Sequence, residues 1–189
     1  MTAPDQNLLE RVANKLSLPP SYSEDGTKSS ILTVAAASYG SKPTTDDITQ
    51  PTGFDPDAAA LFEAVVEAAF LVANADGDFD PTERAAFEHV VLSACEGVVG
   101  QGQVHALVAD LEDQMHEDGI EKRVQMVART VTKPEHAQEI LRVAALLAQV
   151  SGGVSDVERK VLQQLAKSFG SDEAALDRAF AEAEQALSD

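Results

Sequence analysis

The hydrophobic and polar positions of this chain recur at helical spacing from residue 55 almost to the C-terminus. The pattern begins at Asp55-Pro56, which places Asp at an N-cap and Pro at the first helical position. The helix predicted from there is apolar nearly all round, as is typical of a helix at the centre of a fold. A second helix of this kind follows Thr132-Lys133-Pro134-Glu135, where we expect a capping box.

Five further segments carry their apolar residues on one helical stripe, which indicates amphipathic helices. They are residues 81–99, 103–117, 120–131, 156–169 and 172–187. No segment has a convincing strand pattern. The sequence therefore predicts an all-α domain over residues 55–187, a compact bundle of about seven helices.

Residues 1–54 differ from the rest of the chain in composition. From Ser21 to Gly53 they are rich in Ser, Thr, Gly, Asp and Pro, so they bury too little apolar surface to order alone. We therefore predict a flexible N-terminal tail. Two short apolar segments interrupt it, Leu8–Leu16 and Ile31–Ala37. They either dock on a partner or fold back onto the helical domain, and the sequence leaves both alternatives open.

An internal repeat relates the two apolar helices and the loops that follow them. Residues 55–97 align with residues 130–172 at an offset of 75 positions, which gives repeat units of about 55–100 and 130–172. An alanine, a glycine, a glutamate and an arginine are identical around the two loops. Each unit is predicted to be a buried helix, a Gly-containing loop and a capped helix. We expect the two units to pack about a pseudo-two-fold axis.

The loop of the first unit is acidic, and its pattern resembles a known family. It reads Ala75-Asp76-Gly77-Asp78-Phe79-Asp80-Pro81-Thr82-Glu83, an Ala-Asp-Gly-x-hydrophobe-x-x-x-Glu pattern after an Ala-rich helix. Together with its weaker copy about 75 residues later, it resembles the TerB family of tellurite-resistance proteins. The resemblance covers about residues 55–187. It implies a seven-helix fold, a role in tellurite and general stress resistance, and a metal-binding cluster of acidic residues.

The candidate metal ligands are acidic side chains of the two loops. Asp76, Asp78, Asp80 and Glu83 fall within eight residues, and Glu158 is the matching glutamate of the second unit. Hard cations such as calcium and magnesium bind several such oxygens, so a divalent cation is the expected cofactor.

Two features count against a strong or symmetric metal site. Aligned with an EF-hand loop, Asn74 takes the third position, but the first falls on Val72, which cannot ligate a cation. In the second unit, Ser151-Gly152-Gly153 replaces the Asp-Gly of the family pattern. Any site is therefore expected to be weak and one-sided.

Helix capping is the alternative interpretation of these acidic residues. Asp80-Pro81-Thr82-Glu83 and Ser155-Asp156-Val157-Glu158 both have the form of a capped helix start. Capping explains Asp80, Glu83 and Glu158 without any ion. It does not explain Asp76 and Asp78, whose charges repel the others unless they are exposed or bridged by a cation.

Charge and hydropathy exclude several partner classes. With 14 Lys and Arg against 32 Asp and Glu, the formal net charge of −18 would repel nucleic acids and anionic membranes. The longest apolar run, near residues 68–73, is too short to span a bilayer. Residues 1–20 lack the pattern of a signal peptide. We therefore expect a cytoplasmic protein whose only route to a membrane is a membrane-protein partner.

The sequence has no pattern that predicts an enzyme. It contains no P-loop and no supported Ser-His-Asp or Cys-His arrangement, and Cys95 lies in an apolar run as a buried hydrophobe would. The favoured hypothesis is a TerB-like binding or scaffold protein of the stress response that acts through a protein partner. The alternative is a helical adaptor whose N-terminal tail docks a partner, with the acidic loop purely structural.

Overall fold

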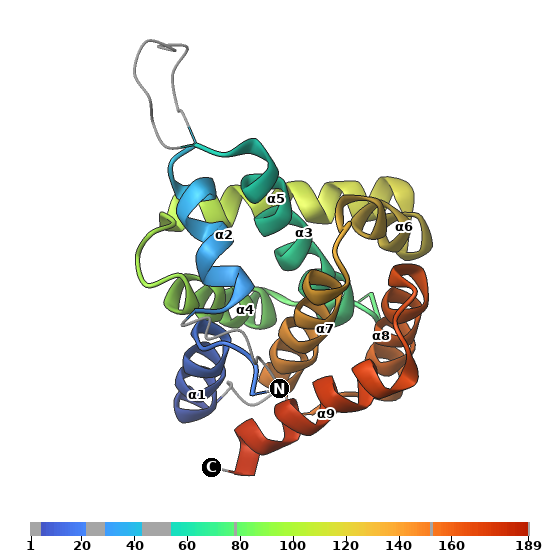
Figure 1. Cartoon of the computed structure of the whole chain (residues 1–189). Coiled ribbons are helices and arrows are strands. Elements are labelled where there is room, and N and C mark those ends of the chain that lie inside the picture. The colour runs from blue at the N-terminus through green and yellow to red at the C-terminus, as the bar shows by residue number, and fades with distance from the viewer. Residues whose placement is uncertain (1–4, 22–28, 43–53, 78, 152, 189) are drawn as a thin grey trace.

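A computed structural model describes residues 5–21, 29–42, 54–77, 79–151 and 153–188. Within these ranges the protein is all-α, with nine α-helices, one short 3-10 helix (η1) and no strand (Figure 1). The elements are α1 (Gln6–Ser17), α2 (Ile31–Gly40), α3 (Pro56–Ala73), α4 (Pro81–Ala94), α5 (Gln101–Asp118), α6 (Ile120–Thr130), α7 (Pro134–Ala148), η1 (Gln149–Ser151), α8 (Asp156–Phe169) and α9 (Glu173–Ser188). None of these helices has the length and hydrophobicity that crossing a membrane requires.

The predicted count of about seven helices is wrong, because the described part of the chain contains nine. The seven expected helices correspond to α3–α9, and the two additional ones, α1 and α2, are the short apolar segments of residues 1–54. The predicted division into a tail and a domain at residue 54 stays a prediction. Most of the predicted tail, residues 1–4, 22–28 and 43–53, lies outside the described residues.

The two apolar helices α3 and α7 lie side by side at the centre of the molecule (Figure 1). Both are buried on nearly every face, as their composition predicts. Around the start of α4 three rings meet edge to face, with centroids 5.4 Å apart for Phe70 and Phe79 and 6.0 Å apart for Phe79 and Phe87. Such pairs add to the free energy gained from burial. This ring cluster fixes where α4 begins relative to α3.

The helices α1 and α2 are folded back onto the rest of the protein. Leu16 of α1 and Leu32 of α2 are almost fully buried, and both belong to the common core. In α2, Tyr39 packs on Phe62 of α3 with ring centroids 4.6 Å apart. Gly40 lies so close to Val98 that an added Cβ would stand 2.1 Å from its carbonyl oxygen. Each segment is too short to be ordered alone, but the core provides the apolar surface that it lacks.

Hydrogen bonds at the helix starts test the capping predictions. The capping boxes of α4, from Asp80 and Glu83, and of α8, from Ser155 and Glu158, are both present. The capping box expected before α7 is wrong. The N-cap of α7 is Lys133, whose side chain accepts no hydrogen bond from the backbone of the helix. The structure does not support the predicted duplication, because an N3 side chain also accepts from the N-cap N–H at α5, outside the paired units, and the pseudo-two-fold axis stays a prediction.

Candidate functional site

The acidic loop connects the end of α3 to the start of α4. The backbone turns at Gly77, whose N–H donates to the Asn74 carbonyl at 3.1 Å and whose φ is +80°. Glycine adopts this left-handed conformation without steric cost. Asp76 is exposed, and Asp78 lies outside the described residues, so its predicted role is not tested.

Asp80 and Glu83 use one carboxylate oxygen each to cap α4. Asp80 Oδ1 accepts from the backbone N–H groups of Thr82 at 2.7 Å and Glu83 at 2.9 Å. In return, Glu83 Oε2 accepts from the N–H of Asp80 at 3.2 Å. The bond from the Glu83 N–H, followed by those from Thr82, holds the pKa of Asp80 below its ordinary value. Asp80 and Glu83 therefore cap α4 with one oxygen each. The second oxygen of each carboxylate takes no part in the cap.

Glu158 is the buried carboxylate of the candidate site. Its side chain caps α8 by accepting from the Ser155 N–H at 2.7 Å, and the residue is only 7% exposed. Burial raises the pKa of Glu158, bonds from Ser155 oppose this, and the negative charges of Asp76 and Glu83 raise it further. The electrostatic effect of Asp76 and Glu83 on Glu158, together with the contacts between α4 and η1, indicates that the two loops are neighbours. Asp76, Glu83 and Glu158 thus belong to two neighbouring loops, and their role as ligands stays a prediction.

Two buried amides lie at the starts of the two loops. The sequence indicates Asn74 only as the third position of an EF-hand-like loop, and it does not predict Gln149 as a site residue. Asn74 is 6% exposed and Gln149 is 3% exposed, and they are the C-caps of α3 and α7. Within the described part of the chain, neither Asn74 Oδ1 nor Gln149 Oε1 has a hydrogen-bond partner. An unpaired buried oxygen is costly, so each needs a water or a cation. The sequence contained a sign of this pair of amides, because Asn74 and Gln149 occupy matching positions in the alignment at an offset of 75 residues.

The carboxylates do not form a closed ligand cage by themselves. Among the residues that the structure describes, no three His, Cys, Asp or Glu side chains are close enough to hold a metal ion. The arrangement is an open edge with separate acidic groups, some of them already used as helix caps. A cation here would need amide oxygens and water to complete its coordination.

Cys95 has the environment expected of a structural residue. It is fully buried at the end of α4, and burial raises the pKa of its thiol to about 12. A thiol with such a pKa is almost entirely protonated at neutral pH and is a poor nucleophile. The residue belongs to the core.

Comparison with known proteins identifies the family. The family model for the tellurite resistance protein TerB matches residues 63–185, which is more than half of the chain. The chain belongs to the TerB family. No curated protein and no solved structure shows a significant match to it. The TerB match begins inside α3 and ends inside α9, so it includes both loops of the candidate site and leaves α1 and α2 outside.

Proposed function

We propose that this TerB protein is a non-enzymatic binding module of the stress response that takes up one divalent cation where its two loops meet. The observation that carries the proposal is the position of Glu158. A buried carboxylate is normally stabilised by a positive partner, but the neighbouring charges of Asp76 and Glu83 are negative. A cation between the loops would relieve this repulsion.

The ligands of the proposed site come from both loops. Asp76 and Glu158 would supply carboxylate oxygens from opposite sides, and Asn74 and Gln149 would supply buried carbonyl oxygens that have no partner in the described part of the chain. Asp80 and Glu83 add their second oxygens, and Asp78 remains a predicted ligand of the same loop. The mixture of carboxylate and amide oxygens favours calcium over magnesium, which requires stricter octahedral geometry.

We expect the cation to bind weakly. Three of the carboxylates are partly engaged as helix caps, through Asp80, Glu83 and Glu158. Loops with an incomplete ligand set hold calcium with dissociation constants on the order of 10⁻⁴ to 10⁻³ M. Such a site responds to large changes in cation concentration.

A protein partner is the proposed target of the module. The net charge of −18 suits a basic protein surface and opposes nucleic acids. We place the protein in the cytoplasm and propose that it reaches a membrane only through a membrane-protein partner. The adaptor alternative requires α1 and α2 to be free, whereas Leu16 and Leu32 are buried in the core. We therefore do not favour it.

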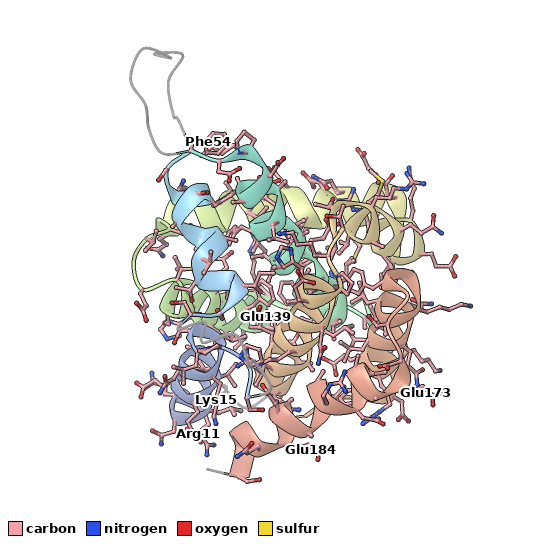
Figure 2. All side chains as sticks on the ribbon, viewed as in Figure 1. Arg11, Lys15, Phe54, Glu139, Glu173 and Glu184 are labelled. Carbon is pink, nitrogen blue, oxygen red and sulfur yellow. The ribbon has the colours of Figure 1, made fainter. Side chains whose placement is uncertain are left out.

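Calcium and magnesium titrations followed by thermal melting test the cation site. A ligand at about ten times its dissociation constant stabilises the folded state by about 1.4 kcal/mol. For a chain of this size, that raises Tm by about 3–5 °C. Glu158→Gln should abolish most of this shift. Glu184→Gln, an exposed position near the C-terminal end of α9 (Figure 2), should leave it intact. No shift at about 10 mM calcium would contradict the proposal.

A further inference from the structure

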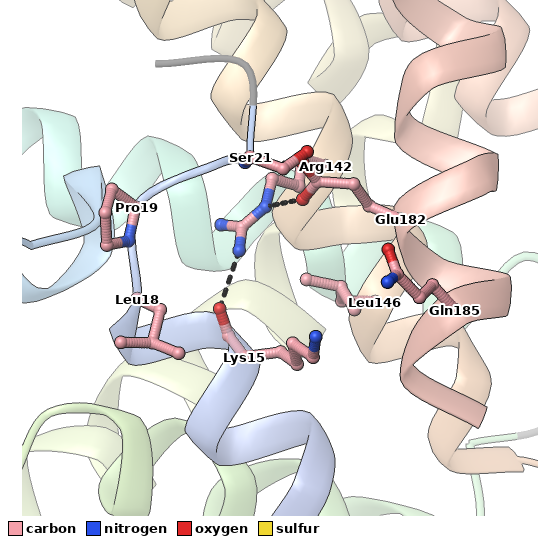
Figure 3. A pocket seen from close by; sticks show the side chains of 8 residues that line it. All are labelled: Lys15, Leu18, Pro19, Ser21, Arg142, Leu146, Glu182 and Gln185. Atoms are coloured by element: carbon pink, nitrogen blue, oxygen red, sulfur yellow. Dashed lines mark hydrogen bonds and ion pairs between the residues drawn. The ribbon is translucent and has the colours of Figure 1, made fainter. Parts of the chain in front are cut away.

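A small cavity lies where the chain around the end of α1 meets α7 and α9 (Figure 3). Its volume is about 100 Å³. Lys15, Leu18 and Ser21 contribute walls from the N-terminal side, and Arg142 and Glu182 contribute walls from the TerB core. It is lined by none of the residues of the cation site.

Arg142 has one guanidinium nitrogen without a partner. The side chain is 2% exposed, although α7 is otherwise nearly all apolar. Its Nε donates to the Glu182 carboxylate, and its Nη2 donates to the Lys15 carbonyl at 2.7 Å (Figure 3). Nη1 finds no acceptor among the described residues. Buried N–H groups rarely stay unpaired, so this one requires an oxygen atom in the cavity.

Among the described residues, the other polar groups of the cavity provide no acceptor for Nη1. Glu182 Oε1 accepts from the Ser21 N–H at 2.8 Å and also from the Ser21 hydroxyl, and its other oxygen is bound to Arg142. Among the described lining residues Glu182 is the one carboxylate, and each of its oxygens already accepts a hydrogen bond. The unpaired group of the cavity is the Nη1 donor of Arg142, so a ligand that satisfies it must supply an acceptor.

The charged groups and the volume of the cavity restrict which ligands it can bind. Arg142 brings a guanidinium group into the lining of this cavity, and its Nε is paired with the Glu182 carboxylate. The Gln185 amide is a further donor on the wall formed by α9. A cavity of about 100 Å³ has room for several water molecules or for one group of acetate size. Guanidinium groups pair most strongly with carboxylates.

We propose that this cavity binds a single carboxylate group, with one oxygen on Arg142 Nη1. Because the walls come from both the N-terminal segment and the TerB core, the bound carboxylate holds the end of α1 against α7 and α9. The site shares no residue with the proposed cation site. Each can therefore fail without the other.

A titration of the full-length protein with sodium acetate tests the proposal. Amide NMR signals of Lys15, Leu18 and Ser21 should shift in a saturable way, with sodium chloride at the same ionic strength as the control. The Nε–H signal of Arg142 should shift with the same midpoint. Shifts that grow without saturation, or that match those in chloride, would show that the cavity holds only water and would overturn the proposal.

Two substitutions localise the binding. Leu18 is 47% exposed and lines the cavity, so Leu18→Trp should fill it and weaken acetate binding at least 10-fold. Met126→Trp is the matched control, because Met126 on α6 is 39% exposed and does not line the cavity. Arg142→Lys keeps the charge and removes Nη1, and it should also weaken binding. If Arg142→Lys folds poorly, the result for Leu18→Trp decides whether acetate binds in the cavity. Acetate binding by Leu18→Trp as tight as that of the unsubstituted protein would contradict this assignment.

The source of the carboxylate is tested with short peptides. A blocked glycine dipeptide with a free C-terminal carboxylate is compared with acetate and with its own C-terminal amide. Tighter binding of the peptide acid than of acetate assigns the cavity to the C-terminus of a protein partner. Equal binding assigns it to a free small carboxylate. Equal binding of the peptide amide and the peptide acid would overturn carboxylate recognition.

Discussion

At the scale of single residues, Glu158 combines two roles that conflict. It caps α8 through the Ser155 N–H, which favours the ionised form, but burial and the charges of Asp76 and Glu83 favour the protonated form. Burial is the largest of these effects, so the pKa is raised. The buried Glu67 and the half-buried Glu139 also have a raised pKa, and burial is again the largest cause. Glu67 has Arg123 as a partner at 2.6 Å, whereas Glu158 faces negative neighbours.

The pH dependence of Glu158 follows from this direction. Between the unfolded and the folded pKa, the folded protein binds more protons than the unfolded chain. As pH rises from the unfolded pKa through the folded pKa, ionisation of Glu158 therefore lowers the free energy of unfolding. Below the unfolded pKa the carboxyl is protonated in both states and has no such effect. We predict that the side-chain carboxyl carbon of Glu158 titrates above the ordinary glutamate value of 4.5 in an NMR experiment. Millimolar calcium should lower that midpoint. A midpoint at or below the ordinary value would contradict this account of the site.

Cys95 allows a second test at the residue scale. Its thiol is fully buried and has a pKa of about 12, so only a small fraction is ionised at pH 8. We predict that a disulfide reagent modifies the folded protein at the rate of global unfolding, and that the reaction becomes fast in denaturant. Rapid labelling without denaturant would mean that α4 opens locally.

At the scale of elements, the local sequence pattern predicted helices α3–α9. It did not predict how α1 and α2 pack, because contacts with distant parts of the chain determine that packing. The starts of α4 and α8 are encoded by side chains within three positions of the cap, so the sequence reveals them. The environment of α1 is not local, because its Lys15 carbonyl binds Arg142, which is 127 positions away. The electrostatic effect of Asp76 on Glu158 is also non-local, because the two residues belong to different loops. Arg142, inside a nearly all-apolar helix, was the visible sign of a buried polar contact.

The contact between α2 and the chain after α4 gives a prediction at this scale. Gly40→Ala would place a Cβ 2.1 Å from the Val98 carbonyl oxygen, so the backbone must shift. We expect a loss of about 1–3 kcal/mol in the free energy of unfolding, measured with urea. Gly102→Ala is the control, because that glycine lies in α5 with open space around it. Its substitution should stabilise the protein by about 0.5–1 kcal/mol. Equal effects would contradict the close packing of α2.

At the scale of the whole molecule, the core extends beyond the part that matches the family. The match covers residues 63–185, but the buried cluster also includes residues of α1 and α2. Composition suggested a tail because it describes each segment alone and contains no information about the surface that the segment can cover. The helices α1 and α2 bury part of α4 and α3, respectively.

Hydrogen exchange tests this extension of the core. We predict that amides in α1 and α2 are protected to a degree comparable with α3, since all three helices share one hydrophobic cluster. Leu16→Ala, at a fully buried position of α1, should cost about 2–5 kcal/mol in unfolding free energy. Exchange of α1 at the rate of an unfolded peptide would show that it is a detachable segment.

The most direct test of the central claim, a cation shared by two loops, is a double-mutant cycle on the calcium-induced rise in Tm. The cycle compares the native protein with Asp76→Asn, Glu158→Gln and the double variant. If one ion bridges both loops, each single variant loses most of the rise and the double variant loses little more. A full calcium response in Glu158→Gln would contradict the claim, because the first loop would then bind the ion alone.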